Sequence, residues 1–278
     1  MKRLVLALAL MAATASATAA TRFVSLGGDI TETVYALHAE DGLLAVDTTS
    51  QYPAAATRLP SVGYVRQLSA EGVLALHPEL ILATHDAGPA TAIAQLHDAG
   101  VRMETMPASR TAADVSAKIR QIGKALGREK DAETLASDVD ARFAALARSV
   151  AAMPTHPRAV FLMSTGTGSP MAAGRETAAD RALALAGGRN AVDSFPGYKA
   201  ISAEALVALA PDVIVLMRES EKAVGGVDGV LAMPGVAQTP AGRARRIEFV
   251  DGQALLGFGP RMATTAQALQ STWASFKP

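Results

Sequence analysis

Cysteine is absent from this sequence, aromatic residues are scarce, and neither sign of charge is in excess. Without cysteine the chain has no disulfide bonds, no cysteine nucleophile and no residue to carry the lipid of an exported lipoprotein. The 26 basic and 26 acidic residues cancel, which gives no support for binding to nucleic acid or to a charged membrane surface. Because only 4% of the residues are aromatic, a protein that stacks on sugars is also disfavoured.

Long hydrophobic runs are also lacking, but the first twenty residues have the pattern of a signal peptide. Lys2 and Arg3 precede an apolar run from Leu4 to Met11, and an Ala-x-Ala sequence follows at Ala17 to Ala19. The apolar run is too short to span a bilayer. We therefore expect residues 1–20 to be removed and the mature protein to be exported, soluble and, without a lipoprotein cysteine, periplasmic.

A segment of fifteen residues occurs twice in the chain. Leu68–Leu82 and Ile201–Val215 are identical at seven of the fifteen positions, and a Gly-Tyr pair precedes each copy, at Tyr64 and at Tyr198. A unit used twice, about half the chain apart, predicts two lobes of the same construction.

Each copy predicts a loop, a short helix and a buried strand. A serine can cap the first helical turn, and the glutamate two residues later complements the positive end of the helix dipole. A proline then ends the helix, and a continuous apolar run follows, as in strands covered on both faces of a parallel sheet. The residues are Ser69, Glu71 and Pro78 in the first copy and Ser202, Glu204 and Pro211 in the second.

The remaining pattern predicts an α/β fold of two Rossmann-like lobes with mainly parallel sheets and a ligand cleft between them. We expect an N-terminal lobe at residues 21–110, a helical connection at 111–156 and a C-terminal lobe at 157–278. Within the connection, the apolar spacing from Arg128 to Met153 predicts a single long helix of roughly 38 Å. A single helical connection of this kind would let the lobes rock slightly relative to each other but would not allow a wide hinge closure. The loop at residues 27–29 predicts a tight turn into a helix or, with less support, an anion site.

The repeat, the glycine loop and the segment from Asp47 to Tyr64 together resemble the periplasmic haem-binding proteins of bacterial haem-import ABC transporters. That family belongs to the solute-binding class with two α/β lobes joined by one rigid helix, shared with cobalamin and ferric-siderophore binders. The most specific part is Gly63–Arg66 leading into Ser69–Glu71, with its echo at residues 197–204. The resemblance covers essentially the whole mature chain.

The resemblance implies that Tyr64 is the axial ligand of ferric haem. A phenolate is a hard oxygen donor that suits Fe(III), and a nearby cation must offset its high pKa. Arg66 and Arg218 are candidates to bind the phenolate oxygen or a haem propionate. Tyr198 is either a wall of the cleft or packing at the lobe interface. Lys199, like Arg66, either faces the cleft or is a solvated loop charge.

The resemblance also implies a partner, the dimeric permease of the inner membrane. In this class one glutamate on each lobe contacts arginines of the permease, and Glu71 and Glu204 occupy those positions. The alternative is that both carboxylates only stabilise their helices.

The histidines of this chain lead us to expect one haem per protein, and we separately expect a monomer. Some relatives stack two haems with a histidine of the second lobe, but residues 164–171 contain none, and His156 precedes a predicted strand. His38, His77 and His97 are predicted on helices, and His85 at a strand end is a weak candidate neighbour of the pocket.

Other functions have less support. The chain has no G-x-S-x-G, no H-E-x-x-H and no clustered histidines and carboxylates, so we expect neither an enzyme nor a zinc or manganese carrier. Carriers of ferric siderophores or cobalamin remain open as alternatives, because they have the same architecture.

Overall fold

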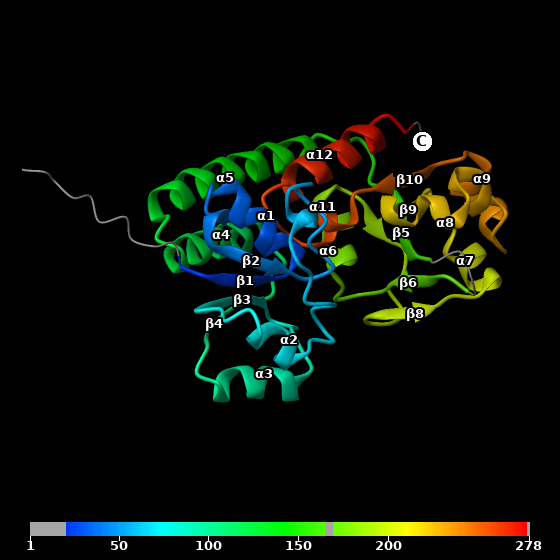
Figure 1. The fold of residues 1–278 in the computed structure, drawn as a ribbon. Helices are drawn as coiled ribbons and strands as arrows, with labels where there is room; N and C mark the ends of the chain where they lie inside the picture. The colour runs from blue at the N-terminus through cyan, green and yellow to red at the C-terminus, as the bar shows by residue number, and fades with distance from the viewer. Residues whose placement is uncertain (1–20, 165–168, 277–278) are drawn as a thin grey trace, which may run out of the picture.

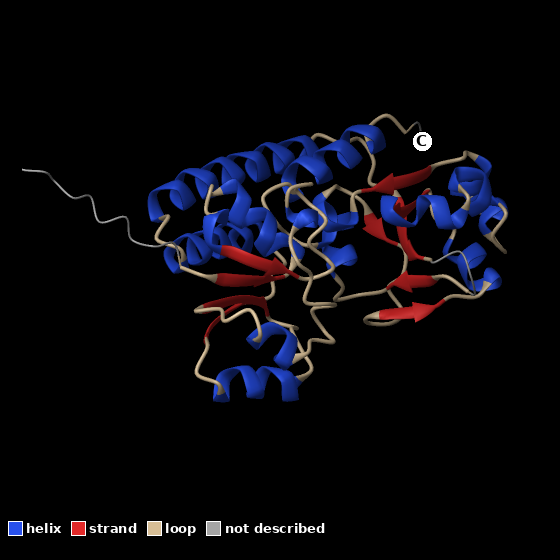
Figure 2. Cartoon of the chain, in the orientation of Figure 1, coloured by secondary structure: helices blue, strands red, loops and turns tan. Residues whose placement is uncertain are grey.

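Two α/β lobes lie side by side in the computed structural model, which describes residues 21–164 and 169–276 (Figure 1, Figure 2). The expected two-lobe α/β fold is confirmed. The predicted signal peptide, residues 1–20, lies outside the described residues. Within those residues, no helix combines the length and apolar character needed to cross a membrane.

The sheet of the first lobe is entirely parallel, in the order β2-β1-β3-β4. Its strands are β1 (Phe23–Leu26), β2 (Leu43–Val46), β3 (Leu80–Thr84) and β4 (Arg102–Met106). The helices of this lobe are α1 (Gly28–Ala36), α2 (Ala70–Leu74) and α3 (Ala90–Asp98), with short 3₁₀ turns η1 (Glu40–Gly42) and η2 (Ala56–Arg58). In β3, Leu80 and Leu82 face one hydrophobic cluster, while Ile81 faces a second cluster under α2 and α3. Burial on both faces explains the unbroken apolar run.

The sheet of the second lobe is mixed. Its strands are β5 (Arg158–Met163), β6 (Met171–Ala173), β7 (Arg189–Asn190), β8 (Tyr198–Ala200), β9 (Val213–Met217) and β10 (Ile247–Val250). The order is β10-β9-β5-β6-β8, with β7 beside β5, and β6 runs antiparallel to both of its neighbours. The connection between β5 and β6 is short, and a parallel return would need a crossover of a dozen or more residues.

Short helices cover this second sheet and complete the chain. They are α6 (Ala178–Leu185), α7 (Ala203–Leu209), α8 (Glu221–Val224), α9 (Gly226–Leu231), α10 (Pro240–Arg243), α11 (Gly252–Leu256) and α12 (Met262–Trp273), with 3₁₀ turns η3 (Arg218–Ser220) and η4 (Val236–Gln238).

The two copies of the repeat form the same local structure. The hydroxyl of Ser69 accepts the Gly72 amide, and that of Ser202 accepts the Ala205 amide, each at 3.2 Å. His77 lies after the end of α2 with a φ of 48°, and His38 lies after α1 with a φ of 49°. Their prediction on helices was wrong, because both helices end before them in a left-handed turn. His97 is in the last turn of α3.

A shared hydrophobic core joins the lobes along α4 (Ala112–Ala125), α5 (Glu129–Ala151) and α12. One cluster runs from Phe23 of β1 through Val139 of α5 to Phe161 of β5 and Trp273 of α12. Figure 1 shows α5 and α12 lying along the same side of both lobes. The long helix is therefore one member of a packed layer, and that packing resists rotation of one lobe against the other.

Polar contacts between α1 and the segment around α11 add to this core. Arg261 Nε donates to Glu32 at 2.9 Å and Nη1 donates to Asp251 at 2.5 Å. Burial raises the pKa of Glu32, even though the charge of Arg261 and its hydrogen bonds act in the opposite direction. The carboxylate of Glu32 is nearly inaccessible to water, so its pairing with Arg261 helps to hold the lobes in one arrangement.

Candidate functional site

A cavity of about 880 Å³ lies between the two lobes. The first lobe contributes residues that directly follow β1, β3 and β4, and the second contributes Met163 at the end of β5 and Met217 at the end of β9. The carboxyl ends of parallel strands are where open α/β sheets bind their ligands. The predicted interlobe cleft is therefore present, and it has the size of a small-molecule site.

Tyr64 and Arg66 lie on the first-lobe wall of this cavity. Val65 between them is buried under β3, and its carbonyl accepts the Gly88 amide at 2.9 Å. This anchor turns the two flanking side chains outward. Tyr64 remains 37% exposed.

Arg66 joins Tyr64 to the loop after β3. Its Nη1 donates to the Tyr64 hydroxyl, and its Nε donates to Asp86 Oδ2 at 2.8 Å. The guanidinium carbon lies 5.5 Å from the centre of the Tyr64 ring. A cation is thus already in place beside the phenol oxygen.

Arg66 and Asp86 are both charged at neutral pH. Burial alone would lower the pKa of Arg66, but hydrogen bonds to Asp86 and Tyr64 outweigh it and the pKa is raised. For Asp86, burial would raise the pKa, but the hydrogen bonds and charge of Arg66 outweigh it and the pKa is lowered. Arg66 therefore stays a cation and keeps its positive charge beside the Tyr64 hydroxyl.

Tyr198 faces the same cavity from the second lobe. It also packs against the shared core, so the structure combines the two roles considered for it. Burial raises the pKa of Tyr198, and hydrogen bonding toward Ala179 and Thr177, followed by the charge of Arg66, only partly offsets this effect.

Lys199 and Arg218 are not among the described residues that line the cavity. Successive side chains on a strand face opposite sides, so Lys199 turns away where Tyr198 turns in. The Lys199 ammonium lies 5.2 Å from the centre of the Phe195 ring. Arg218 Nη2 donates to the Phe249 carbonyl at 3.0 Å. The structure thus brings together Tyr64, Arg66 and Tyr198 and leaves the other two predicted cations outside this group.

Other residues at the cavity were not predicted from the sequence. Lys118 of α4 pairs with Asp29, and its ammonium also donates to the Gly257 carbonyl at 3.2 Å. Gln253 of α11 accepts the backbone amide of Gln51 at 2.8 Å. Asp86 also lines the cavity. The sequence could have indicated this residue, because it follows a predicted parallel strand and polar side chains meet at the ends of such strands.

The glycine loop after β1 is a tight turn, as expected. The Gly27 amide donates to Asp47 at 2.9 Å and the Gly28 amide donates to Thr49 at 3.0 Å. A Cβ on Gly28 would lie 2.5 Å from the Thr49 carbonyl, so the turn needs glycine there. Because these amides already have partners, the anion interpretation loses its donors.

His85 is the histidine that lines the cavity within the described residues. Its Nδ1 lies 3.4 Å from the Thr84 hydroxyl. In that part of the chain, no group of three histidines, cysteines or carboxylates is placed to bind a metal ion.

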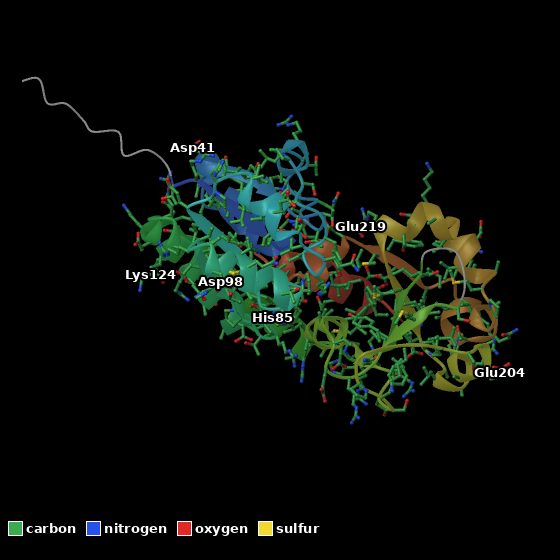
Figure 3. The ribbon with its side chains drawn as sticks, turned by 60° about the horizontal axis from the view of Figure 1, so that its bottom comes forward. Asp41, His85, Asp98, Lys124, Glu204 and Glu219 are labelled. Carbon is green, nitrogen blue, oxygen red and sulfur yellow. The ribbon has the colours of Figure 1, made fainter. Side chains whose placement is uncertain are left out.

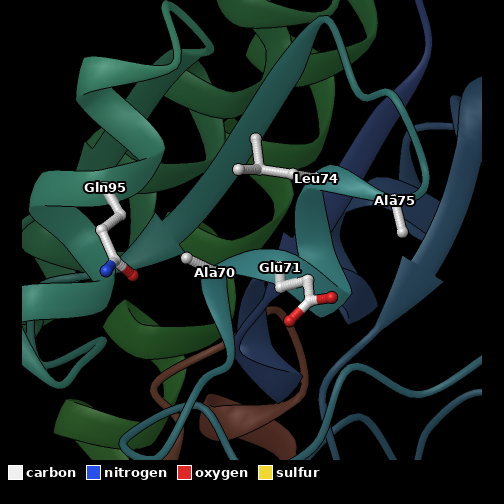
Figure 4. A pocket seen from close by; sticks show the side chains of 5 residues that line it. All are labelled: Ala70, Glu71, Leu74, Ala75 and Gln95. Carbon is white, nitrogen blue, oxygen red and sulfur yellow. The ribbon is translucent and has the colours of Figure 1, made fainter.

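Glu71 and Glu204 lie on the surface, away from the cavity. Figure 4 shows Glu71 beside Leu74 of α2 and Ala75, which follows α2, across from Gln95 of α3, and these residues line a surface pocket. Figure 3 shows Glu204 at the outer end of the second lobe. Its own backbone amide, followed by the Ser202 hydroxyl, lowers the pKa of Glu204, which lies in the first turn of α7.

The fold and the cleft define a two-lobe solute-binding protein. The family model named Periplasmic binding protein matches residues 23–254, and the chain belongs to this family. Its curated relatives include an uncharacterized ABC transporter substrate-binding lipoprotein, YvrC of Bacillus subtilis, 27% identical over 89% of this chain and 78% of the relative. The vitamin B12-binding protein of Photorhabdus laumondii is 28% identical over 72% of each chain. The protein is thus a solute-binding protein that functions outside the cytoplasm.

Solved structures are more similar. The periplasmic haem-binding protein RhuT from Roseiflexus sp. RS-1, in its apo form, has a TM-score of 0.88 and 39% identity over 92% of this chain and 98% of its own. The periplasmic haem-binding protein BhuT in complex with two haems has a TM-score of 0.86 and 41% identity, covering 91% and 97%. A periplasmic haem-binding protein from Pseudomonas aeruginosa has a TM-score of 0.82 and 38% identity, covering 93% and 95%.

Proposed function

We propose that this protein captures ferric haem in the interlobe cleft and delivers it to an ABC importer of the inner membrane. The observation that carries the proposal is the Tyr64 phenol at the cleft wall, with the Arg66 guanidinium on its oxygen. Similarity over nearly the whole chain to haem-binding proteins supports the same ligand.

Tyr64 is the proposed ligand of the haem iron. Coordination needs the phenolate, whose formation at neutral pH is unfavourable for a free tyrosine. Arg66 reduces that cost because it donates to the oxygen that becomes negative. Fe(III) prefers such a hard anionic donor and Fe(II) does not, so the site suits oxidised haem.

The rest of the cavity suits a flat, mostly apolar ring. Thioether side chains line it from both lobes, and they adapt to irregular apolar surfaces. The methionines are Met106, Met163, Met171 and Met217. Tyr198 adds an aromatic face on the second lobe.

We propose one haem per protein. The loop of residues 164–171 has no histidine, although residues 165–168 lie outside the described part of the chain. Burial raises the pKa of Tyr198, which makes a second phenolate costly. BhuT holds two haems, so the equivalence point of a hemin titration decides between one and two.

Cobalamin is the second candidate, because vitamin B12-binding proteins are among the relatives. Cobalamin carries its own axial base and does not need a phenolate from the protein. A ferric siderophore likewise saturates its iron. Neither ligand would need the Tyr64 phenol or the Arg66 guanidinium that donates to it, so this pair favours haem.

The test is a titration of the mature protein with hemin, followed by visible spectroscopy, with cyanocobalamin in parallel. We expect a saturating spectrum with a phenolate-to-iron charge-transfer band that Tyr64→Phe abolishes. Tyr35→Phe, on α1 away from the cavity, is the matched control and is expected to behave as wild type. Tight binding of cyanocobalamin without specific binding of hemin would overturn the proposal.

The proposed setting is the periplasm, reached through cleavage of residues 1–20, with the protein as a monomer. Glu71 and Glu204 are the proposed contacts to the permease. Two matched carboxylates on two similar lobes suit the two subunits of a dimeric permease.

A further inference from the structure

The loop between β4 and α4 lines the cavity with residues 107–110. Two of these residues, Ser109 and Arg110, have polar side chains. The Arg110 backbone amide donates to Asp114 at 2.9 Å, whereas its guanidinium has no hydrogen bond, ion pair or ring contact within the described residues. This loop therefore carries an arginine whose charge is not used by the protein.

The other cations of the cavity are already paired. Of the lysine and arginine side chains that line it in the described residues, Arg66 is bound to Asp86 and Lys118 to Asp29. Arg110 is the cation that remains available to an incoming anion. A guanidinium can bind a carboxylate with two parallel hydrogen bonds.

The neighbouring Ser109 adds a second donor without a partner. Its hydroxyl oxygen is buried and makes no hydrogen bond. A buried hydroxyl that lacks a partner destabilises the protein until a ligand or water supplies one. A carboxylate oxygen at this point would accept from both residues.

The loop is also held in position before any ligand arrives. Asp114 Oδ2 accepts the amides of Arg110 and Thr111, each at 2.9 Å, and the Thr111 hydroxyl accepts the Asp114 amide at 3.2 Å. This reciprocal cap fixes the start of α4 and with it the backbone of Ser109 and Arg110. A preorganised donor pair loses less entropy on binding.

We infer that Ser109 and Arg110 form a subsite for a carboxylate of the bound ligand. The inference rests on the proposed function, in which that carboxylate is a propionate of haem. Tyr64 would then bind the iron, and this loop would bind the charged edge of the ring. The subsite gives a preferred orientation to a ligand whose other contacts are mostly apolar.

The test compares hemin with hemin dimethyl ester, in which both propionates are esterified. Arg110→Gln is expected to weaken hemin binding by about 10- to 100-fold, the range of a charge-assisted hydrogen bond, and to leave binding of the ester unchanged. The saturated spectrum of hemin stays that of the wild type because Tyr64 is untouched. Arg128→Gln, an exposed arginine between α4 and α5, is the matched control.

Ser109→Ala separates ligand binding from loop structure. We expect it to weaken hemin binding while the midpoint of thermal unfolding of the free protein stays equal or rises, because an unpaired buried hydroxyl is removed. A lower midpoint with unchanged affinity would assign Ser109 to loop structure and remove it from the subsite.

Two other outcomes overturn the inference in different ways. If Arg110→Gln binds hemin as tightly as Arg128→Gln, or loses hemin and ester equally, the carboxylate subsite is wrong and the haem-carrier function stands. If the wild-type protein does not bind hemin at all, the proposed function fails, and this inference fails with it.

Discussion

Arg66 donates a hydrogen bond to the hydroxyl of Tyr64, and the same guanidinium holds Asp86 of the next loop. The side chains of residues 64 and 66 can meet because Val65 between them is anchored in the core. Asp86 keeps the guanidinium in place, and the guanidinium donates to the Tyr64 oxygen. The three residues therefore act as one group.

Arg66→Met tests this group. Loss of the cation raises the cost of the phenolate and leaves Asp86 as an unpaired negative charge at the cleft. We expect hemin affinity to fall by about 10- to 100-fold, the effect of one charged hydrogen bond, with a shifted charge-transfer band.

The double variant Arg66→Met with Asp86→Asn separates the two causes. If the unpaired carboxylate accounts for part of the loss, the double variant binds hemin more tightly than Arg66→Met alone. Wild-type affinity and spectrum in Arg66→Met would remove Arg66 from the site.

Gln253 is expected to hold the lobes together. Its Oε1 accepts the amides of Gln51 at 2.8 Å and Tyr52 at 3.0 Å, and its Nε2 donates to the Gly28 carbonyl at 2.8 Å. Gln253→Ala should lower the free energy of unfolding by about 1–3 kcal/mol and speed hydrogen exchange at the two amides. Gln95→Ala, at an exposed position of α3, is the control. Unchanged exchange at both amides would contradict this role.

Glu248 should make stability depend on pH. Burial raises its pKa to about 7, although the Trp273 indole donates to the carboxylate at 3.0 Å. Because this folded-state pKa lies above the unfolded value, the folded protein binds more protons between about pH 4.5 and 7. Stability therefore falls as the pH rises through that window, by at most about 3 kcal/mol, and levels off above it.

Glu248→Gln removes the titrating group and keeps an acceptor for Trp273. We expect the variant to be more stable than the wild type at pH 8 and to lose this part of the pH dependence. Urea unfolding of both proteins at pH 5, 6, 7 and 8 measures the difference. Parallel pH profiles for the two proteins would show that Glu248 does not titrate in this range.

Charge reversal tests docking to the permease. Glu71→Arg with Glu204→Arg should leave hemin affinity unchanged, because both residues lie outside the cavity, and reduce haem uptake by a reconstituted importer about tenfold or more. Glu129→Arg with Glu221→Arg is matched, since these carboxylates also lie in first turns of helices. Equal loss of uptake in both double variants would point to net charge and not to specific contacts.

Much of the fold could be predicted because its signals are local. The repeated Ser-x-Glu and proline define a capped helix and its end, and the unbroken apolar run Leu80–Leu82 indicates a strand buried on both faces, between two clusters. Tyr64 could be found for the same reason, since it stands beside the repeat in a recognisable loop.

The tertiary structure alone decided which side chains share the cleft. Asp86 meets Arg66, and Lys118 meets Asp29, through pairings that depend on how distant loops are placed by the sheet and helices. The position of β8 against the cavity decides that Tyr198 lines it and Lys199, the next residue along the strand, does not. Short-range chemistry in the sequence thus determined the helices, strands and first ligand candidate. The ion-pair partners of Arg66 and Lys118, and the unpaired guanidinium of Arg110, depended on long-range packing. Such packing brings together residues that are far apart in the sequence, and the sequence alone does not indicate which of them will meet.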